Sequence, residues 1–192
     1  MPDFQLIAKP ACSPDADSQF GEYAVLEVPL AIVSVAAFDL SNGEALLSKF
    51  LGVELPEVAK WVENGSRSAL WVGPGQWFVT SDESEHATLF NSLSNAVGEE
   101  AAVTDQSGGW VCFDVAGPKL ADVLEKLVGF DIASSGAGDA QRTTIEHIGC
   151  FVLCKSQTAA RVFCPRSYAR SLQHSLVQAI RSQLAFEKTS AS

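Results

Sequence analysis

Apolar and polar positions follow two different periods along this chain. Runs rich in Val, Ile and Trp, bounded by Gly, Pro, Asp or Ser, are typical of strands. The predicted strands cover residues 23–28, 32–38, 68–72, 77–81, 101–105, 110–115, 143–147, 151–155 and 160–164. Other segments carry apolar residues three and four positions apart, which is typical of amphipathic helices. The predicted helices cover residues 41–51, 85–97, 119–128 and 167–184.

Capping and turn residues set the expected boundaries of these elements. Ser41 and Glu44 fit a capping box at the start of the first helix, and Gly52 and Gly98 are expected to end the first two helices. Short connections with turn residues favour antiparallel pairing of consecutive strands. We therefore predict an α+β fold in which antiparallel strand pairs alternate with helices, rather than a doubly wound parallel sheet.

The expected domain organisation is one compact α+β domain over residues 21–186, with possible halves at about 21–100 and 101–186. Residues 1–20 are predicted to form an extended N-terminal leader, and residues 187–192 a frayed tail. A Gly-Pro pair recurs at residues 73–74 and 117–118, which is compatible with two related halves.

Composition narrows the classes of protein to consider. A chain of 192 residues with 47% hydrophobic residues can bury a full core. Only 19% of the residues are charged, which favours a protein that covers part of its surface with a partner. The net charge of -10 argues against nucleic-acid binding, which needs a basic face. No segment is apolar over the length of a membrane span, and the N-terminus lacks a signal-peptide pattern.

The charge is unevenly distributed along the chain. No Asp or Glu lies between His147 and Phe186, and all but Glu187 of the 23 acidic residues precede this segment. The segment instead contains five bases: Lys155, Arg161, Arg166, Arg170 and Arg181. This basic end has two interpretations, an oriented contact with an acidic surface or anion, and ion pairs with the chain's own carboxylates.

The five cysteines predict a reduced, cytoplasmic protein with thiols packed in its core, because their number is odd and their settings are mostly apolar. Cys150 and Cys154 follow His147 closely, which raises the hypothesis of a metal site. In a strand these cysteines would lie roughly 13 Å apart, at ~3.3 Å per residue. A zinc ion binds sulfur at about 2.3 Å, so we predict no metal site.

The chain lacks the common catalytic and nucleotide-binding motifs. Ser107 lies in a predicted turn outside any Gly-x-Ser-x-Gly elbow, and Gly136-Ala-Gly138 lacks the third glycine and the strand–turn–helix setting of a dinucleotide site. We therefore predict no catalytic, cofactor-binding or metal-binding residue in this chain. Tryptophan and arginine are enriched at interfaces, although tryptophan also fills cores. The candidate residues for a partner interface are Trp71, Trp77, Trp110, Arg166 and Arg170.

Four stretches in a fixed order carry a family resemblance: WVGPGQWFV at 71–79, DQSGGWVCFDVAGP at 105–118, LADVLEKLVGFD at 120–131 and PRSYA at 165–169. Together they resemble the gamma subunit of heterotetrameric sarcosine oxidase, over most of the chain from about Leu46 to the final helix. That family is similar to a reduced form of the aminomethyltransferase (T-protein) fold of the glycine cleavage system, which binds tetrahydrofolate.

The resemblance implies a role in the oxidative demethylation of sarcosine to glycine, with formation of hydrogen peroxide and, with tetrahydrofolate, methylenetetrahydrofolate. It implies alpha, beta and delta subunits as partners, with FAD, FMN, NAD, zinc and tetrahydrofolate held by those subunits and none by this chain. The chain also lacks the Asn/Gly/Asp-rich stretch that supplies the catalytic aspartate of true aminomethyltransferases. Two alternatives stay open: a free-standing folate-binding or one-carbon-transfer protein, and a subunit of a related dehydrogenase that demethylates another methylated amine.

Overall fold

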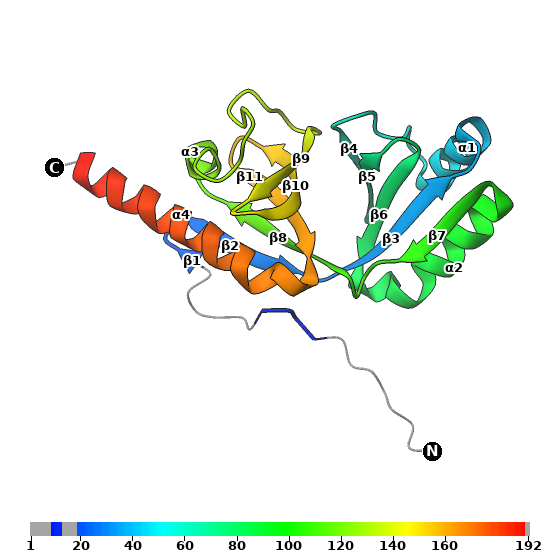
Figure 1. Cartoon of the computed structure of the whole chain (residues 1–192), viewed down its shortest axis with the longest axis horizontal. Coiled ribbons are helices and arrows are strands. Elements are labelled where there is room, and N and C mark those ends of the chain that lie inside the picture. Colours follow the sequence, from blue (N-terminus) through cyan, green and yellow to red (C-terminus); the bar gives the residue numbers. More distant parts are fainter. Residues whose placement is uncertain (1–8, 13–18, 191–192) are drawn as a thin grey trace, which may run out of the picture.

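The computed structural model describes residues 9–12 and 19–190, which form two antiparallel sheets that face each other, with helices on their outer faces (Figure 1). The six-stranded sheet has the order β1 (Gln19–Phe20), β2 (Tyr23–Val28), β8 (Trp110–Ala116), β11 (Ala159–Pro165), β10 (Ile148–Ser156) and β9 (Ala140–Ile145). The five-stranded sheet has the order β4 (Trp61–Asn64), β5 (Arg67–Gly73), β6 (Gln76–Asp82), β3 (Leu30–Ala37) and β7 (Ala101–Asp105). The predicted α+β class with antiparallel strands is confirmed.

Four helices cover the two sheets. They are α1 (Leu40–Leu51), α2 (His86–Val97), α3 (Leu120–Leu124) and α4 (Ala169–Ser190), and the short 3-10 turns η2 (Glu83–Glu85), η3 (Gly98–Glu100) and η4 (Arg166–Tyr168) adjoin α2 and α4. Helices α1 and α2 lie on the five-stranded sheet, and α3 and α4 lie on the six-stranded sheet (Figure 1). None of the helices in the described part of the chain is long and apolar enough to cross a membrane.

The chain crosses twice from one sheet to the other. Strand β2 pairs with β8 (Val25 opposite Val115), and the chain then passes through Pro29 into β3 of the other sheet. Strand β7 pairs with β3 (Val103 opposite Val35), and residues 106–109 return the chain to β8. The pairing predicted between consecutive strands at these two places is therefore wrong.

The physical reason differs at the two crossings. The segment Val28-Pro29-Leu30 contains no Gly, Asn or Asp with the positive φ that a two-residue hairpin needs, so the chain continues into the other sheet. At residues 106–109 the turn residues would permit a hairpin. There the partner is chosen by distant strands, because β7 closes the open edge of β3.

The two crossings reveal an internal repeat. The first unit is β2-β3-α1-β4-β5-β6-α2 and the second is β7-β8-α3-β9-β10-β11-α4. Their strands have matching positions, β4-β5-β6-β3-β7 in one sheet and β9-β10-β11-β8-β2 in the other. Each unit therefore contributes its first strand to the sheet of the other unit. The recurring Gly-Pro pair is no mark of this repeat, because Gly73-Pro74 lies in the β5–β6 hairpin and Gly117-Pro118 precedes α3.

Three apolar layers hold the elements together. Leu47 and Leu89 belong to the core between the five-stranded sheet and its helices, and Leu124 and Leu172 to the core on the six-stranded sheet. A third core lies between the sheets, and its aromatic rings stack edge to face. Phe78 contacts Trp110 and Phe151 at centroid distances of 5.1 and 6.1 Å. Since most strands are buried on both faces, their apolar runs are nearly continuous.

Several element boundaries differ from those expected. Asp39 caps α1 by accepting hydrogen bonds from the backbone of Ser41 and Asn42, at 2.8 and 3.4 Å, so the predicted capping box is wrong. Gly52 ends this helix in the left-handed conformation, as predicted. Strand β4 was missed because its sequence, Trp-Val-Glu-Asn, is short and half polar. Helix α3 stops at Leu124, where its last turn tightens.

The first and last described segments, residues 9–12 and the end of α4, contact the six-stranded sheet. Helix α4 continues to Ser190, past its predicted end at residue 184 and into the predicted tail, and its Glu187 accepts a hydrogen bond of 3.2 Å from the Tyr23 hydroxyl. The backbone N–H groups of Ala11 and Cys12 donate to the Glu27 carboxylate at 2.7 and 2.8 Å. Residues 1–8 and 13–18 of the predicted leader, and residues 191–192 of the predicted tail, lie outside the described residues.

Candidate functional site

A cavity of about 780 Å³ lies where the chain crosses between the sheets. Both crossings contribute to its wall, with Val28, Leu30, Ser107 and Trp110 among the lining residues. His86 at the start of α2 and Arg166 in η4 add an imidazole and a guanidinium from the two helical ends. The internal repeat therefore creates one concave site from equivalent parts of its two units.

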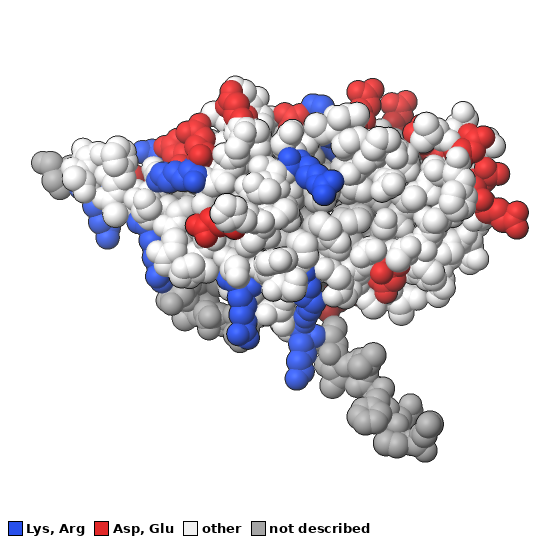
Figure 2. All heavy atoms as spheres, in the orientation of Figure 1, with Lys and Arg blue, Asp and Glu red and all other residues white. Residues whose placement is uncertain are grey.

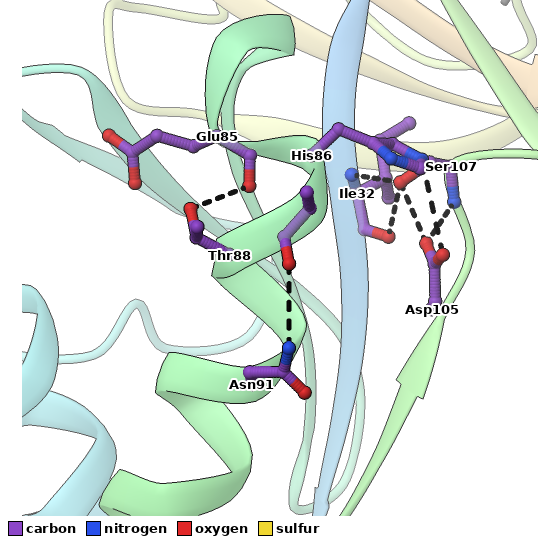
Figure 3. Close-up of polar contacts among 8 residues, drawn as sticks. Ile32, Glu85, His86, Thr88, Asn91, Asp105 and Ser107 are labelled. Atoms are coloured by element: carbon purple, nitrogen blue, oxygen red, sulfur yellow. Dashed lines mark hydrogen bonds and ion pairs between the residues drawn. The ribbon is translucent and has the colours of Figure 1, made fainter. Parts of the chain in front are cut away.

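A polar network holds the second crossing against β3 (Figure 3). The Ser107 hydroxyl donates to the Asp105 carboxylate at 2.7 Å and accepts a hydrogen bond of 3.0 Å from the Ile32 backbone N–H. The backbone N–H of Ser107 also donates to Asp105, at 2.9 Å, which closes a turn of the Asp-x-Ser type. The network therefore fixes the path of the crossing.

The same carboxylate lies near a histidine. The distance between His86 Nε2 and Asp105 Oδ2 is 3.9 Å, and both side chains are about half exposed. The order serine–carboxylate–histidine places the carboxylate between the hydroxyl and the imidazole, whereas a catalytic triad needs the imidazole beside the hydroxyl. The geometry supports a structural role for Ser107. The sequence analysis missed the proximity of Asp105 to His86. The spacing Asp105-x-Ser107 could have indicated the turn, but not the nearby histidine.

The two carboxylates that precede α2 lie differently, and that of Glu85 points away from the cavity. Figure 3 shows Glu85 pointing away from Ser107, with its backbone carbonyl accepting a hydrogen bond of 3.1 Å from Thr88. The Glu85 carboxylate accepts from Arg67 at 3.0 Å, and this hydrogen bond lowers the pKa of Glu85. Among the described residues, the groups of this helix end that face the cavity are Glu83 and His86.

The five cysteines are free and buried, as predicted. Cys112 lies in the cavity wall and its thiol donates to the Val28 carbonyl at 3.1 Å. Burial raises the pKa of Cys112, Cys150 and Cys164 to about 12. A thiol with such a pKa is a poor nucleophile and a poor metal ligand at neutral pH. The described part of the chain also contains no group of three His, Cys, Asp or Glu side chains able to hold a metal ion, so zinc does not fit these residues.

The candidate interface tryptophans pack inside the chain to different degrees. Trp77 is only 3% exposed, and its indole N–H donates to the Pro56 carbonyl at 3.3 Å, so Trp77 is a core residue rather than a contact residue. Trp110 packs between the sheets, 5.8 Å from the ring of Phe151, and also lines the cavity. Trp71 is partly buried against the core below α1 and α2.

The bases of the C-terminal segment divide into two groups. Arg161 donates to both oxygens of Asp114, at 2.6 and 2.9 Å, and Lys155 lies 3.7 Å from the same carboxylate. These two bases therefore form internal ion pairs. Arg166 lines the cavity and donates to the carbonyl of Lys9.

Arg170 is exposed, unlike the two bases that pair with Asp114. It lies in the first turn of α4, and no ion pair with another described residue involves it. Figure 2 shows basic side chains along the edge where α4 runs, and acidic side chains over the part of the surface that α1 and α2 occupy.

Comparisons with known proteins agree with this architecture. The model of the sarcosine oxidase, gamma subunit family matches residues 34–180. The chain is similar to a chain of heterotetrameric sarcosine oxidase from Corynebacterium sp. U-96 in complex with pyrrole 2-carboxylate. The two are 25% identical with a TM-score of 0.78, and the match covers 87% of this chain and 89% of that chain.

A second solved structure shares the fold. The chain is 14% identical to glycine cleavage system aminomethyltransferase T from Bartonella henselae, with a TM-score of 0.64. The match covers 84% of this chain and 46% of that chain, so this chain spans less than half of the aminomethyltransferase. The predicted likeness to the T-protein fold is confirmed. No protein of curated function is significantly similar in sequence.

Proposed function

This chain belongs to the sarcosine oxidase gamma subunit family, and from that premise we propose that it acts as a non-catalytic subunit of a heterotetrameric sarcosine oxidase. The observation that carries this proposal is the family match over residues 34–180, which includes the second crossing and most strands of both sheets. The described part of the site supports a non-catalytic role, since the Ser107 hydroxyl is bound by a carboxylate and the thiols are buried.

The reaction we propose for the complex is oxidative demethylation of sarcosine. Sarcosine, oxygen and tetrahydrofolate would yield glycine, hydrogen peroxide and methylenetetrahydrofolate. We assign FAD, FMN, NAD, zinc and tetrahydrofolate to the alpha, beta and delta subunits, because the described residues of this chain offer neither a glycine-rich nucleotide loop nor a set of metal ligands. The reduced cysteines support assembly in the cytoplasm.

Co-expression tests this proposal directly. The chain would be produced with the alpha, beta and delta subunits, with an affinity tag on the largest subunit alone. We expect the gamma chain to co-purify in equal stoichiometry and the complex to oxidise sarcosine. A gamma chain that never co-purifies would contradict the proposal. Activity on another methylated amine, without activity on sarcosine, would favour the related dehydrogenase.

Calorimetry tests the alternative that the isolated chain binds tetrahydrofolate. Tetrahydrofolate would be titrated to millimolar concentration into the isolated chain, and we expect no heat of binding. A measured heat, together with a failure to co-purify, would support a free-standing folate-binding protein instead.

We also propose that Arg166 in η4 and the exposed Arg170 in the first turn of α4 take part in assembly. Arg170 is the cleaner probe, because Arg166 also holds the Lys9 carbonyl. Replacing Arg170 by Glu would place a like charge against an acidic partner, and we expect affinity for the complex to fall about tenfold. Lys49→Glu in the last turn of α1 is the matched control. Equal assembly of both variants would exclude Arg170 from the interface.

A further inference from the structure

Two large apolar side chains protrude at one end of the five-stranded sheet. Phe38 is 74% exposed and Leu40 is 54% exposed, and they lie where β3 ends and α1 begins. The exposed Pro74 in the β5–β6 turn lies nearby, because its neighbour Gly75 accepts a hydrogen bond from the Ala37 N–H and a Cβ built on Gly75 would lie 2.8 Å from Leu40 Cδ2. We name Phe38, Leu40 and Pro74 the apolar tip. Single exposed apolar residues are common on protein surfaces, but a group on converging segments calls for a covering partner.

The backbone under the apolar tip is fixed rather than loose. The Ala37 N–H donates to the Gly75 carbonyl and the Phe38 N–H to the Glu100 carbonyl, both at 2.9 Å. Asp39 caps α1 between the two apolar residues. Three segments distant in the sequence thus hold the tip in one geometry. A surface already held in its bound shape loses little conformational entropy on association.

The WVGPGQW motif contributes to the shape of the tip. Gly75 has a φ of 66°, in the left-handed region that favours glycine. A Cβ at this position would lie 2.8 Å from Leu40 Cδ2, so any other residue would also make the leucine side chain shift. The motif that marks the family resemblance therefore has a role at this surface, although it lies apart from the cavity.

Carboxylates surround the apolar tip. Asp39 and Glu44 lie at the start of α1, and Glu99 and Glu100 lie in η3, whose last carbonyl binds Phe38. Within residues 9–12 and 19–190 no ion pair involves any of these four. Figure 2 shows a group of acidic side chains at this end of the molecule, apart from those on the other half. An apolar centre with an acidic rim is complementary to an apolar patch ringed by Lys and Arg.

We propose that the apolar tip and its acidic rim form a docking surface for a basic patch with an apolar centre on a larger subunit of the oxidase. The inference rests on the proposed function and deepens it by naming the surface and the chemistry of its partner. A second copy of this chain is the poorer occupant. Its complementary surface would be the basic edge along α4, and a contact between two different surfaces forms rings or open polymers rather than a closed pair. A tetramer of four different subunits also holds a single gamma chain.

The test compares wild-type and tip variants in the co-expressed oxidase. We expect Phe38→Ser/Leu40→Ser to reduce the gamma chain recovered with the tagged large subunit at least tenfold. Glu99→Lys/Glu100→Lys should reduce it less and should also weaken the salt dependence of assembly. Val58→Ser is the matched control, because Val58 is 66% exposed and lies outside the tip. The thermal unfolding of each isolated variant should match wild type, which shows that folding is intact.

The outcomes separate this inference from the function on which it rests. Wild-type co-purification with normal assembly of the folded tip variants would overturn the docking surface and leave the proposed function standing. Absence of wild-type co-purification would contradict the proposed function itself. Light scattering on the isolated chain completes the test. Self-association that Phe38→Ser/Leu40→Ser abolishes would assign the tip to a second copy, and would overturn the proposal.

Discussion

The two halves of the molecule have the same order of elements, but their helices differ in length. In the five-stranded half, α1 and α2 are 12 residues each. In the six-stranded half, α3 has only 5 residues and α4 has 22. The long α4 reaches over α3 and β2, where Gln183 accepts a hydrogen bond from Lys126 at 2.7 Å and Glu187 accepts one from Tyr23.

The connection from the first core strand to the first helix shows the consequence. In the six-stranded half, Gly117 at this connection lies against the ring of Tyr23, which is 2% exposed. In the five-stranded half, the same connection carries the exposed Phe38 and Leu40. The comparison teaches that a repeated scaffold can close one half on itself and leave the equivalent place of the other half open for a partner.

Cysteine labelling measures how closed the six-stranded half is, and we expect its effect to be the largest. All five cysteines pack in or beside this half. Thiols with a pKa of about 12, such as Cys150 and Cys164, hold far less thiolate at pH 8 than a free cysteine. We expect native labelling to be slower than that of a free thiol by about a thousandfold or more. Ellman's reagent followed by mass spectrometry measures the rates. Rapid labelling of the native chain would show that this half is not closed.

Gly117→Ala breaks the closed connection. A Cβ at this position would lie 2.0 Å from Tyr23 Cδ1, and the tyrosine ring that would have to shift is buried, at 2% exposure. We expect a loss of about 3 kcal/mol in the free energy of unfolding. Urea unfolding measures it, and Gly149→Ala is the control because a Cβ there meets no atom within 4 Å.

A substitution at the corresponding connection of the open half should have a much smaller effect on stability. Phe38→Ser removes an exposed side chain and should alter the stability by about 0.5 kcal/mol or less. Equal losses for Gly117→Ala and Phe38→Ser would contradict the distinction between a closed and an open connection.

Ion pairs offer a smaller contrast between the halves. Asp114→Ala leaves the Arg161 side chain, which is 13% exposed, without its bidentate partner, and we expect a loss of about 2 kcal/mol. In the five-stranded half, Arg67 and Glu85 are each about 30% exposed, and Glu85→Ala should cost about 0.5 kcal/mol. Denaturant unfolding at low and high salt measures both. A loss for Glu85→Ala as large as that for Asp114→Ala would contradict the contrast.

The smallest expected effect concerns Tyr23 at high pH. Burial, followed by the charge of Glu187, raises the pKa of Tyr23 above its ordinary value. The stabilisation from this shift is present below the unfolded pKa of about 10 and is lost as the pH rises through the folded pKa. Phenolate absorbance in a Tyr168→Phe variant, which leaves Tyr23 as the single tyrosine, measures the titration. Glu187→Gln should move it to lower pH, and an unchanged titration would exclude that contact.

Local features of the fold were accessible from the sequence. The β5–β6 hairpin around Gly73-Pro74-Gly75 is formed as expected, and α2 follows the spacing of its apolar residues. Gly52 ends α1 because a left-handed residue stops a helix with no help from distant parts. Each of these features depends on residues a few positions apart, so the pattern along the chain contains the information.

The candidate site was accessible only in part. Trp77 and Phe38 are both large aromatic residues near strand ends, yet the first is buried and the second is exposed. Tryptophan composition could not separate core from surface, because burial depends on which elements pack above a position. The C-terminal bases show the same limit, since Arg161 pairs with Asp114 whereas Arg170 faces outward.

The sequence alone was enough to predict most of the strands, the four helices, the α+β class and the resemblance to the gamma subunit family. Only the tertiary structure decided that β2 and β7 exchange sheets, that the two crossings enclose a cavity, and that Phe38 and Leu40 stay uncovered. The physical reason is that strand pairing and burial are energies between distant segments. The local sequence pattern specifies which face of a segment is apolar. The packing of the two sheets decides which neighbouring element covers that face.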